Sequence, residues 1–334
     1  MRERIVLLLI IFVFSCFAFY APSAQAIEFY HPRAFALGGA YTGLADDYSA
    51  IYYNPAGLAH SGILGFGLGV AAGGQADNAR EFVQNISQIL DDPGIILNNG
   101  EITDLEADYN GLVGLRFGPV GGGLTLKGQA WTDSDNEEAH SKNILGYNLG
   151  FAHQILDPFA DIGAISVGFN ARYLQGSHIS VEEIGAEPEE IRGTGYAADI
   201  GLLVRLTEMV NLGVKVDNAI SSFEWDDSIE NEIFDRTLTV GAGINLPLVG
   251  LTATADLSTV LGNDGSAFRA GVEKRFLLGL IAFRAGLAQE FGEARYYTGG
   301  MGVNLGFLQA DLGIGVEGLN LNKPSAVLGV SANF

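Results

Sequence analysis

The last part of the chain alternates between apolar residues and polar or very small ones. Between 308 and 317, and again between 325 and 334, every second residue is apolar, while the intervening positions are mostly Gly, Ser, Asn, Gln, Asp or Glu. A period of two places successive side chains on opposite faces of a strand. The pattern therefore predicts two strands, each facing one apolar and one polar environment.

The same alternation recurs through most of the sequence. Each run is about as long as a tilted membrane-crossing strand, which needs roughly 9–11 residues. We therefore predict a 14-stranded antiparallel transmembrane β-barrel over 62–334, closed by pairing of its last strand with its first. The expected strands are 62–75, 107–118, 121–132, 143–156, 161–175, 194–206, 209–218, 236–246, 249–261, 265–276, 279–291, 294–306, 307–319 and 325–334.

The connections between these runs differ in length at the two ends of the expected barrel. Those after even-numbered strands are short, whereas most of those after odd-numbered strands are longer and acidic: 76–106, 133–142, 176–193 and 219–235. Short turns at one end and long loops at the other are typical of outer-membrane barrels, whose termini lie on the periplasmic side. Within the first long loop, residues 79–90 have an amphipathic pattern that predicts a short helix.

The first 26 residues predict a signal peptide. Arg2 and Arg4 precede an apolar stretch from Ile5 to Tyr20, and Ala24-Gln25-Ala26 forms a small-residue cleavage site. The only cysteine, Cys16, lies in this segment. The mature chain is therefore expected to be exported and free of disulfides and thiolate metal sites.

Charge and hydropathy narrow the function classes. The net charge of −21 for the full sequence becomes −22 without the signal peptide, so nucleic acid is not an expected partner, because its binding needs clustered Lys and Arg. No apolar run after residue 26 reaches the roughly 18 residues of a spanning helix. For an exported chain of positive mean hydropathy, a closed barrel in the outer membrane is the remaining way to satisfy every backbone group in lipid.

Residues 27–61, ahead of the first strand, do not alternate. Asp47 is placed to cap one helical turn, and Asn54 to cap a second that begins with Pro55. The segment is too apolar and aromatic for a periplasmic tail, and it is short enough to fold back into the barrel. We therefore predict an N-terminal plug inside the lumen.

Residues 38–59 carry a resemblance. The pattern G-G-A-Y-T-G-L-A-D-D-Y-S-A-I-Y-Y-N-P-A-G-L-A resembles the N-terminal hatch of the FadL/TodX-type outer-membrane transporters, and the fourteen-strand count agrees with their barrel. The resemblance implies passage of long-chain fatty acids or other hydrophobic compounds across the outer membrane, with membrane lipid and a small hydrophobic ligand as partners. The implied residues of the hatch and the ligand passage are Asp46, Asp47, Ile51, Tyr52, Tyr53, Asn54, Pro55, Ala56 and Leu58.

The motif is similar also to that of related small barrels in conjugation and secretion systems. A second hypothesis is therefore a non-transporting barrel, which docks envelope proteins or serves as a structural component of the envelope. The short chain, with its reduced external loops, favours this second hypothesis. The apolar hatch residues, such as Ile51 and Leu58, favour ligand passage.

The inward faces predict where the hatch is seated. On the first strand and on the last three, the inward positions include Gly65, Gly67, Gly69, Gly300, Gly302, Gly313, Gly315 and Gly329. Glycine permits close backbone approach, so we expect residues 38–59 to pack on this glycine sector. The tenth and eleventh strands instead form a charged lumen wall from Arg269, Glu273, Arg275, Arg284 and Glu290. Packing of the hatch against that wall would contradict the sector hypothesis.

The sequence contains no convincing catalytic or cofactor motif. The five histidines lack the spacing of metal ligands, and His153 belongs by alternation to the lipid-facing set. We therefore expect no enzyme activity, metal or cofactor. Asp46 and Asp47 are expected to cap a helix and to pair with a lumen arginine. Gly121-Gly122-Gly123 is the expected position of any break in the wall for lateral exit.

Overall fold

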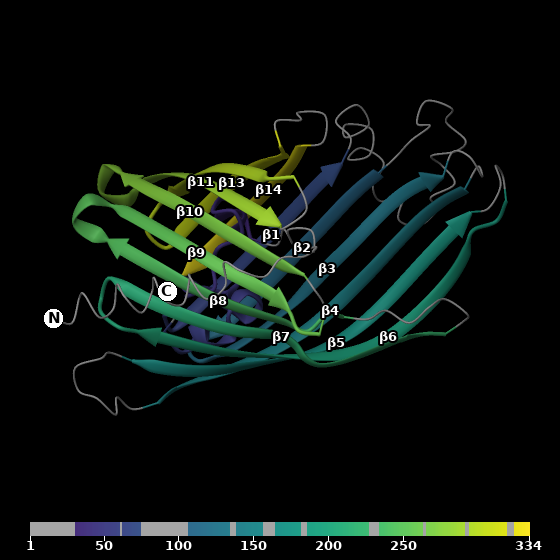
Figure 1. Cartoon of the computed structure of the whole chain (residues 1–334), viewed down its shortest axis with the longest axis horizontal. Coiled ribbons are helices and arrows are strands. Elements are labelled where there is room, and N and C mark those ends of the chain that lie inside the picture. The colour runs from purple at the N-terminus through teal and green to yellow at the C-terminus, as the bar shows by residue number, and fades with distance from the viewer. Residues whose placement is uncertain are drawn as a thin grey trace.

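The chain forms one closed barrel of fourteen antiparallel strands (Figure 1). The computed structural model describes residues 31–60, 62–74, 106–133, 138–155, 164–181, 186–226, 234–262, 265–290, 294–318 and 324–334. The strands are β1 (Leu64–Gly74), β2 (Glu106–Phe117), β3 (Val120–Asp133), β4 (Glu138–Ile155), β5 (Ile165–Val181), β6 (Glu189–Arg205), β7 (Val210–Trp225), β8 (Thr237–Leu246), β9 (Leu251–Val260), β10 (Ser266–Phe276), β11 (Ile281–Glu290), β12 (Tyr296–Asn304), β13 (Leu308–Glu317) and β14 (Pro324–Asn333). The predicted strand number and pairing order are confirmed.

Closure between β14 and β1 follows from the alternation. Their register runs from Gly65 opposite Asn333 to Gly73 opposite Ser325. Along β1, Leu64, Phe66 and Leu68 are exposed on the outer face, and the glycines between them are buried on the inner face. The barrel thus has an outer surface of large apolar side chains and an inner surface of small or polar ones.

The wall is taller on one side than on the other. Strands β4 to β7 contain 16–18 residues, whereas β8 to β14 contain 9–11. The predicted loops 176–193 and 219–235 are therefore wrong in extent, because much of each continues the strands that it was expected to connect. Their charged residues interrupt the apolar alternation, but the backbone pairing continues.

The two ends of the barrel remain distinct. We call the end with the connections 118–119, 206–209, 247–250, 277–280 and 305–307, where Phe334 also lies, the turn end. The opposite end is the loop end. The predicted helix at 79–90 and the signal peptide at 1–26 lie outside the described residues. Within the described ranges, no helix is long and apolar enough to cross a membrane.

The wall is continuous where a break was predicted. Gly121, Gly122 and Gly123 pair with β2 and with β4 without interruption, so that prediction is wrong. An irregularity occurs instead between β6 and β7, where the register shifts around Asp199 and Asn218 adopts a left-handed φ of 51°. Asn218 tolerates this conformation better than most residues.

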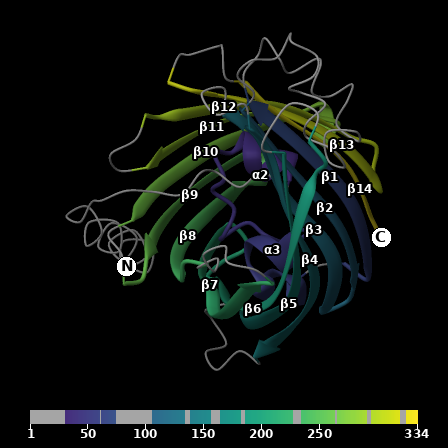
Figure 2. The same ribbon diagram turned by 90° about the vertical axis from the view of Figure 1, so that its right-hand side faces the viewer.

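Residues 31–60, hereafter the N-terminal segment, lie inside the barrel (Figure 2). The segment forms helix α2 (Pro32–Ala36), helix α3 (Ala50–Tyr53) and the 3₁₀ helix η1 (Pro55–His60). Pro32 occupies the first turn of α2, and the ring of His31 accepts a hydrogen bond from the backbone of Ala34, which caps that helix. Gly38 and Gly39, both with positive φ, then turn the chain sharply.

Candidate functional site

A belt of inward-facing glycines surrounds the N-terminal segment. A Cβ atom added at any of these glycines would meet the segment at or inside van der Waals contact, so the absence of a side chain lets the segment lie against the wall. Every strand except β9 contributes to this glycine belt, which consists of Gly67, Gly114, Gly121, Gly150, Gly168, Gly201, Gly213, Gly241, Gly243, Gly271, Gly286, Gly300, Gly313, Gly315 and Gly329.

The expected glycine sector is therefore wrong in its location. The glycines of β12 to β14 meet Pro32, Phe35 and Ala36, which precede the range expected there. Residues 38–59 run instead around the rest of the lumen, from β11 through β5 to β2, and only Tyr48 reaches Gly67 on β1. Alternation shows which side of a strand faces the lumen, but not which part of a long internal segment reaches that strand.

On β9 a carboxylate takes the place of a glycine. One oxygen of Asp256 accepts hydrogen bonds from the backbone amides of Tyr41 (3.0 Å) and Thr42 (2.9 Å). Asp256 is 2% exposed, so this contact is shielded from water. Charge-assisted hydrogen bonds of this kind are stronger than neutral ones, and Asp256 is thus a specific anchor for the middle of the segment.

Asn54, the first residue of the N-P-A motif, links three chain regions. Its amide nitrogen donates to the carbonyl oxygens of Thr42 (2.9 Å) and of Leu202 on β6 (3.1 Å), and its oxygen accepts from the amide of Ala56 (3.1 Å). Asn54 is fully buried. The last bond caps η1, as the sequence predicts for an Asn-Pro start. Pro55 and Ala56 lie against Gly168 and Gly201.

The charged wall also contacts the segment. Arg33 donates from Nε to Glu273 Oε2 (2.9 Å) and from Nη2 to Glu273 Oε1 (3.2 Å). Arg284 and Arg275 bond the same carboxylate, and Arg284 also donates to Asp311 (2.6 Å). The remaining wall residues lie further along these strands: Arg269 donates to Ser258 (2.7 Å), and Glu290 ends β11. Because the N-terminal segment contacts this charged wall, the sector hypothesis is contradicted a second time.

The two adjacent aspartates differ in environment. Asp47 accepts hydrogen bonds from the amide and hydroxyl of Ser49 and from the hydroxyl of Tyr41, and the basic side chain paired with it is His31, at 3.6 Å. The N-cap of α3 is Ser49, so the prediction that Asp47 caps this helix is wrong, and Asp47 instead stabilises the turn before it. Among the described residues, the ion pair of Asp47 is with His31 and not with the expected arginine. Burial favours a higher pKa for Asp47, yet His31, the Ser49 bonds and Arg33 together lower it. Asp46 is exposed at the turn end.

Most of the apolar and aromatic side chains of the motif pack against the barrel wall or against other side chains of the lumen. Ile51 and Leu58 are fully buried and lie against Gly121 and Gly150. Tyr53 packs edge-on against Tyr41, with ring centroids 5.3 Å apart. Tyr52 lies under the ammonium of Lys215, which also donates to the Tyr52 carbonyl oxygen. These side chains fix the segment to the wall, and none of them lines the cavities of the turn end described next.

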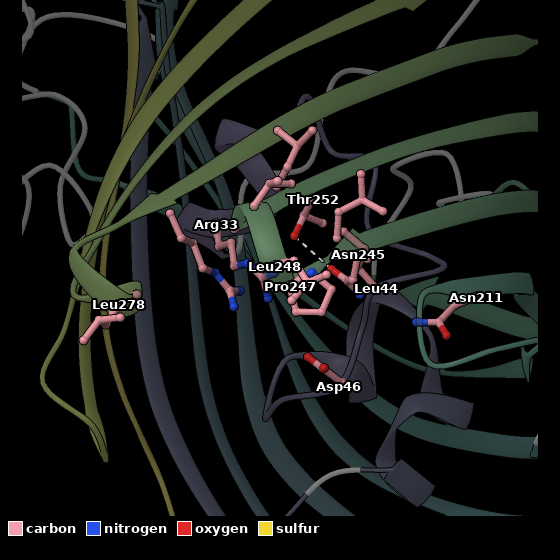
Figure 3. A pocket seen from close by; sticks show the side chains of 15 residues that line it. Arg33, Leu44, Asp46, Asn211, Asn245, Pro247, Leu248, Thr252 and Leu278 are labelled. Carbon is pink, nitrogen blue, oxygen red and sulfur yellow. Dashed lines mark hydrogen bonds between the residues drawn. The ribbon is translucent and has the colours of Figure 1, made fainter.

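Two cavities open at the turn end. The larger, about 620 Å³, lies between the N-terminal segment and the short helices η2 (Pro247–Val249) and η3 (Leu277–Gly279), with Arg33, Asp46 and Leu248 around it (Figure 3). The smaller, about 310 Å³, includes His31, His60 and Arg116. Arg33, Asp46 and Arg275 line both, so the two cavities adjoin.

At the loop end, the tall side of the wall carries an aromatic cluster that lies beyond the predicted strand ends. Trp131 stacks on His140 (4.9 Å between centroids) and on His178 (5.9 Å), and Trp225 packs edge-on against His178. These residues share their faces with belt glycines, so they point inward. An inward alternation continued beyond the predicted strand ends is the signal that reveals this cluster. It is defined as Trp131, His140, His178, Phe223 and Trp225.

No protein-family model matches the sequence, and no curated protein matches it. Solved structures do match the fold. The toluene transporter TodX of Pseudomonas putida gives a TM-score of 0.59 at 11% identity over 94% of this chain and 99% of that one. TbuX, a toluene transporter of Ralstonia pickettii, gives 0.59 at 13% identity over 92% and 99%. A FadL homologue of Pseudomonas aeruginosa gives 0.55 at 11% over 95% and 99%. The chain therefore has the fold of FadL-type hydrocarbon channels.

Proposed function

We propose that this protein is an outer-membrane channel for small hydrophobic compounds and that its N-terminal segment is the hatch. The observation that carries the proposal is the glycine belt, which holds an internal segment against thirteen of the fourteen strands. A lumen occupied in this way does not suit a water-filled general pore. It suits a channel that opens only when the segment moves.

The outer surface supports a membrane location. Large apolar side chains on the outside of the barrel are each about half exposed, among them Phe66, Leu115, Leu149, Phe169 and Ile314. Apolar surface of this extent is unfavourable in water, and lipid is the solvent in which it is stable. The signal peptide predicted for residues 1–26 is consistent with export to that membrane.

The lumen suggests a path for an apolar compound. The aromatic cluster offers stacking surfaces at the loop end, and the path from there to the turn end is occupied by the N-terminal segment. Passage then requires part of the segment to leave the wall, which breaks anchors such as Arg33 to Glu273 or Asn54 to Leu202.

Uptake by cells tests the proposal. Cells that carry the protein should take up a labelled long-chain fatty acid or a monoaromatic hydrocarbon faster than cells that lack it, at equal amounts of folded barrel. Substitution of Trp131 and Trp225 by Ala should slow uptake, whereas the same change at the outward-facing Phe169 should not. Equal uptake with and without the protein, for both compounds, would favour the non-transporting accessory barrel.

A further inference from the structure

Two histidines of the aromatic cluster lie next to each other on the inner wall at the loop end. His140 belongs to β4 and His178 to β5, and their ring centroids are 5.6 Å apart. The two residues are distant in the sequence, and the pairing of β4 with β5 brings them together, with Ser180 opposite His140 and Lys142 opposite His178. Spacing along the chain alone therefore gives no sign of this pair.

Each of the two rings has a nitrogen atom without a partner. Among the described residues, Nδ1 of His140 and Nε2 of His178 are buried and form no hydrogen bond. Buried polar atoms are normally satisfied, so two unpaired nitrogens in adjacent rings indicate a ligand. The other ring nitrogen of His140, Nε2, lies 3.3 Å from Oε2 of Glu138. A carboxylate in this position holds the ring proton on Nε2, which leaves the lone pair of Nδ1 available to a metal ion.

The separation of the rings suits a shared metal ion. Imidazole binds zinc at a metal–nitrogen distance of about 2.1 Å, so two imidazole centroids on one tetrahedral ion are about 5.2 Å apart. A small side-chain movement brings the observed 5.6 Å to this value. Trp131 stacks on both rings, with interplanar angles of 21° and 23°. Because this stacking already restricts the two side chains, little conformational freedom is lost when a metal ion binds.

The charge on this part of the wall favours a cation. The two rows of paired residues that contain His140 and His178 have one basic member, Lys142, and three acidic members: Glu106, Asp108 and Glu189. Glu138, beside His140, adds a fourth carboxylate. Lys127, in the next row towards the turn end, leaves the balance negative. The carboxylates therefore offset the repulsion between Lys142 and a metal ion.

We propose that His140 and His178 bind a divalent late transition-metal ion at the loop end. Imidazole suits Cu²⁺, Ni²⁺ and Zn²⁺, and the mature chain has no thiolate that would favour a softer ion. Within the described ranges no group of three or more His, Cys, Asp or Glu side chains could hold a metal ion. The protein thus supplies two ligands, and water or an incoming ligand completes the coordination. This site is independent of the channel function proposed above.

The chain contains its own reporter for this site. Its two tryptophans, Trp131 and Trp225, both belong to the aromatic cluster, and each packs against His178. Bound Cu²⁺ quenches the fluorescence of a neighbouring tryptophan, whereas Zn²⁺ does not. The full barrel, purified in detergent micelles and free of chelators, is therefore titrated with Cu²⁺ and then with Zn²⁺. His153→Gln is the matched control, because His153 lies on the same strand as His140 and is exposed on the outside.

Cu²⁺ should quench the fluorescence saturably, with a single ion per chain, and Zn²⁺ should restore it by competition. Since even the outer-shell partners of metal ligands are worth about 10- to 100-fold in affinity, His140→Gln and His178→Gln should each weaken binding by at least about tenfold. Glu138→Ala should weaken it about tenfold, because the His140 ring is then no longer oriented. His153→Gln should leave the affinity unchanged. Electron paramagnetic resonance of bound Cu²⁺ should show two imidazole nitrogens, and one in either variant of the pair.

Three results would overturn the proposal: quenching that rises without saturation, equal affinity in His140→Gln, His178→Gln and His153→Gln, or coordination by fewer than two nitrogens in the unsubstituted protein. The last measurement needs no variant, so it decides the proposal even where a substitution disturbs the cluster. None of these results bears on the channel proposal, which is decided by uptake into cells.

Discussion

Adding one methyl group to the glycine belt should release the N-terminal segment locally. In Gly271→Ala on β10, the new Cβ would lie 2.5 Å from the carbonyl oxygen and 2.6 Å from the Cα of Leu37. Both are backbone atoms, so no rotamer change relieves the overlap. To reach 3.4 Å, where ordinary van der Waals contact begins, the segment must retreat by about 0.9 Å.

The expected magnitude follows from the cost of overpacking. Insertion of a methyl group into a tightly packed site costs about 1–3 kcal/mol, which corresponds to roughly a 5- to 150-fold shift in an opening equilibrium. Gly168→Ala on β5 applies the same perturbation to Pro55 and Ala56 on another part of the lumen wall. Each variant should loosen its own part of the segment.

Hydrogen exchange read by mass spectrometry tests this in the folded barrel. Amides near Leu37 should exchange about 5- to 150-fold faster in Gly271→Ala, and amides of residues 54–58 should do so in Gly168→Ala. Gly299→Ala is the control, because its Cβ would meet only the Arg284 carbonyl oxygen, at 3.8 Å. If exchange in both belt variants stays within twofold of the control, the glycine belt does not hold the segment.

Three further changes test the anchors. Asn54→Ala removes three buried hydrogen bonds, at about 1–3 kcal/mol for each group left unpaired, so exchange across the segment should accelerate more than in any other single variant. Arg33→Met leaves Glu273 with two arginines, so only the amides around α2 should exchange faster. Burial lowers the pKa of His60 to about 4, below the unfolded value near 6.5. Protonation therefore favours the detached state as pH falls from 6.5 to 4. Exchange at 55–60, corrected for its intrinsic pH dependence, should rise over that range and stay flat in His60→Gln.

The strand plan was predictable because lipid and lumen impose different side chains on alternate residues. Where the strands extend past the apolar part of the outer surface, the side chains on the two faces no longer differ in this way. The sequence pattern therefore predicts a loop at three acidic residues whose backbones pair in the structure, Glu189 and Glu190 of β6 and Glu224 of β7. The break expected at Gly121-Gly122-Gly123 failed for the converse reason, since glycine weakens a strand without preventing its pairing.

The candidate site was predictable in its parts but not in its arrangement. The cap at Asn54 and the inward charges of β10 and β11 follow from local rules. Which partner each residue meets depends on the path of a segment that crosses most of the lumen, and no period in the sequence encodes that path. The link from Arg33 to Glu273 spans 240 positions, so it became visible only in the folded chain.

The belt and the anchors together explain how a filled lumen can still open. A glycine wall contributes little apolar side-chain area of its own, so the apolar burial comes from side chains of the segment such as Phe35, Ile51 and Leu58, which are fully buried. A few polar contacts add to this burial and fix the position of the segment: Arg33 with Glu273, Tyr41 and Thr42 with Asp256, and Asn54 with Leu202. Because these contacts lie at separate points along the segment, one part can detach while the others hold.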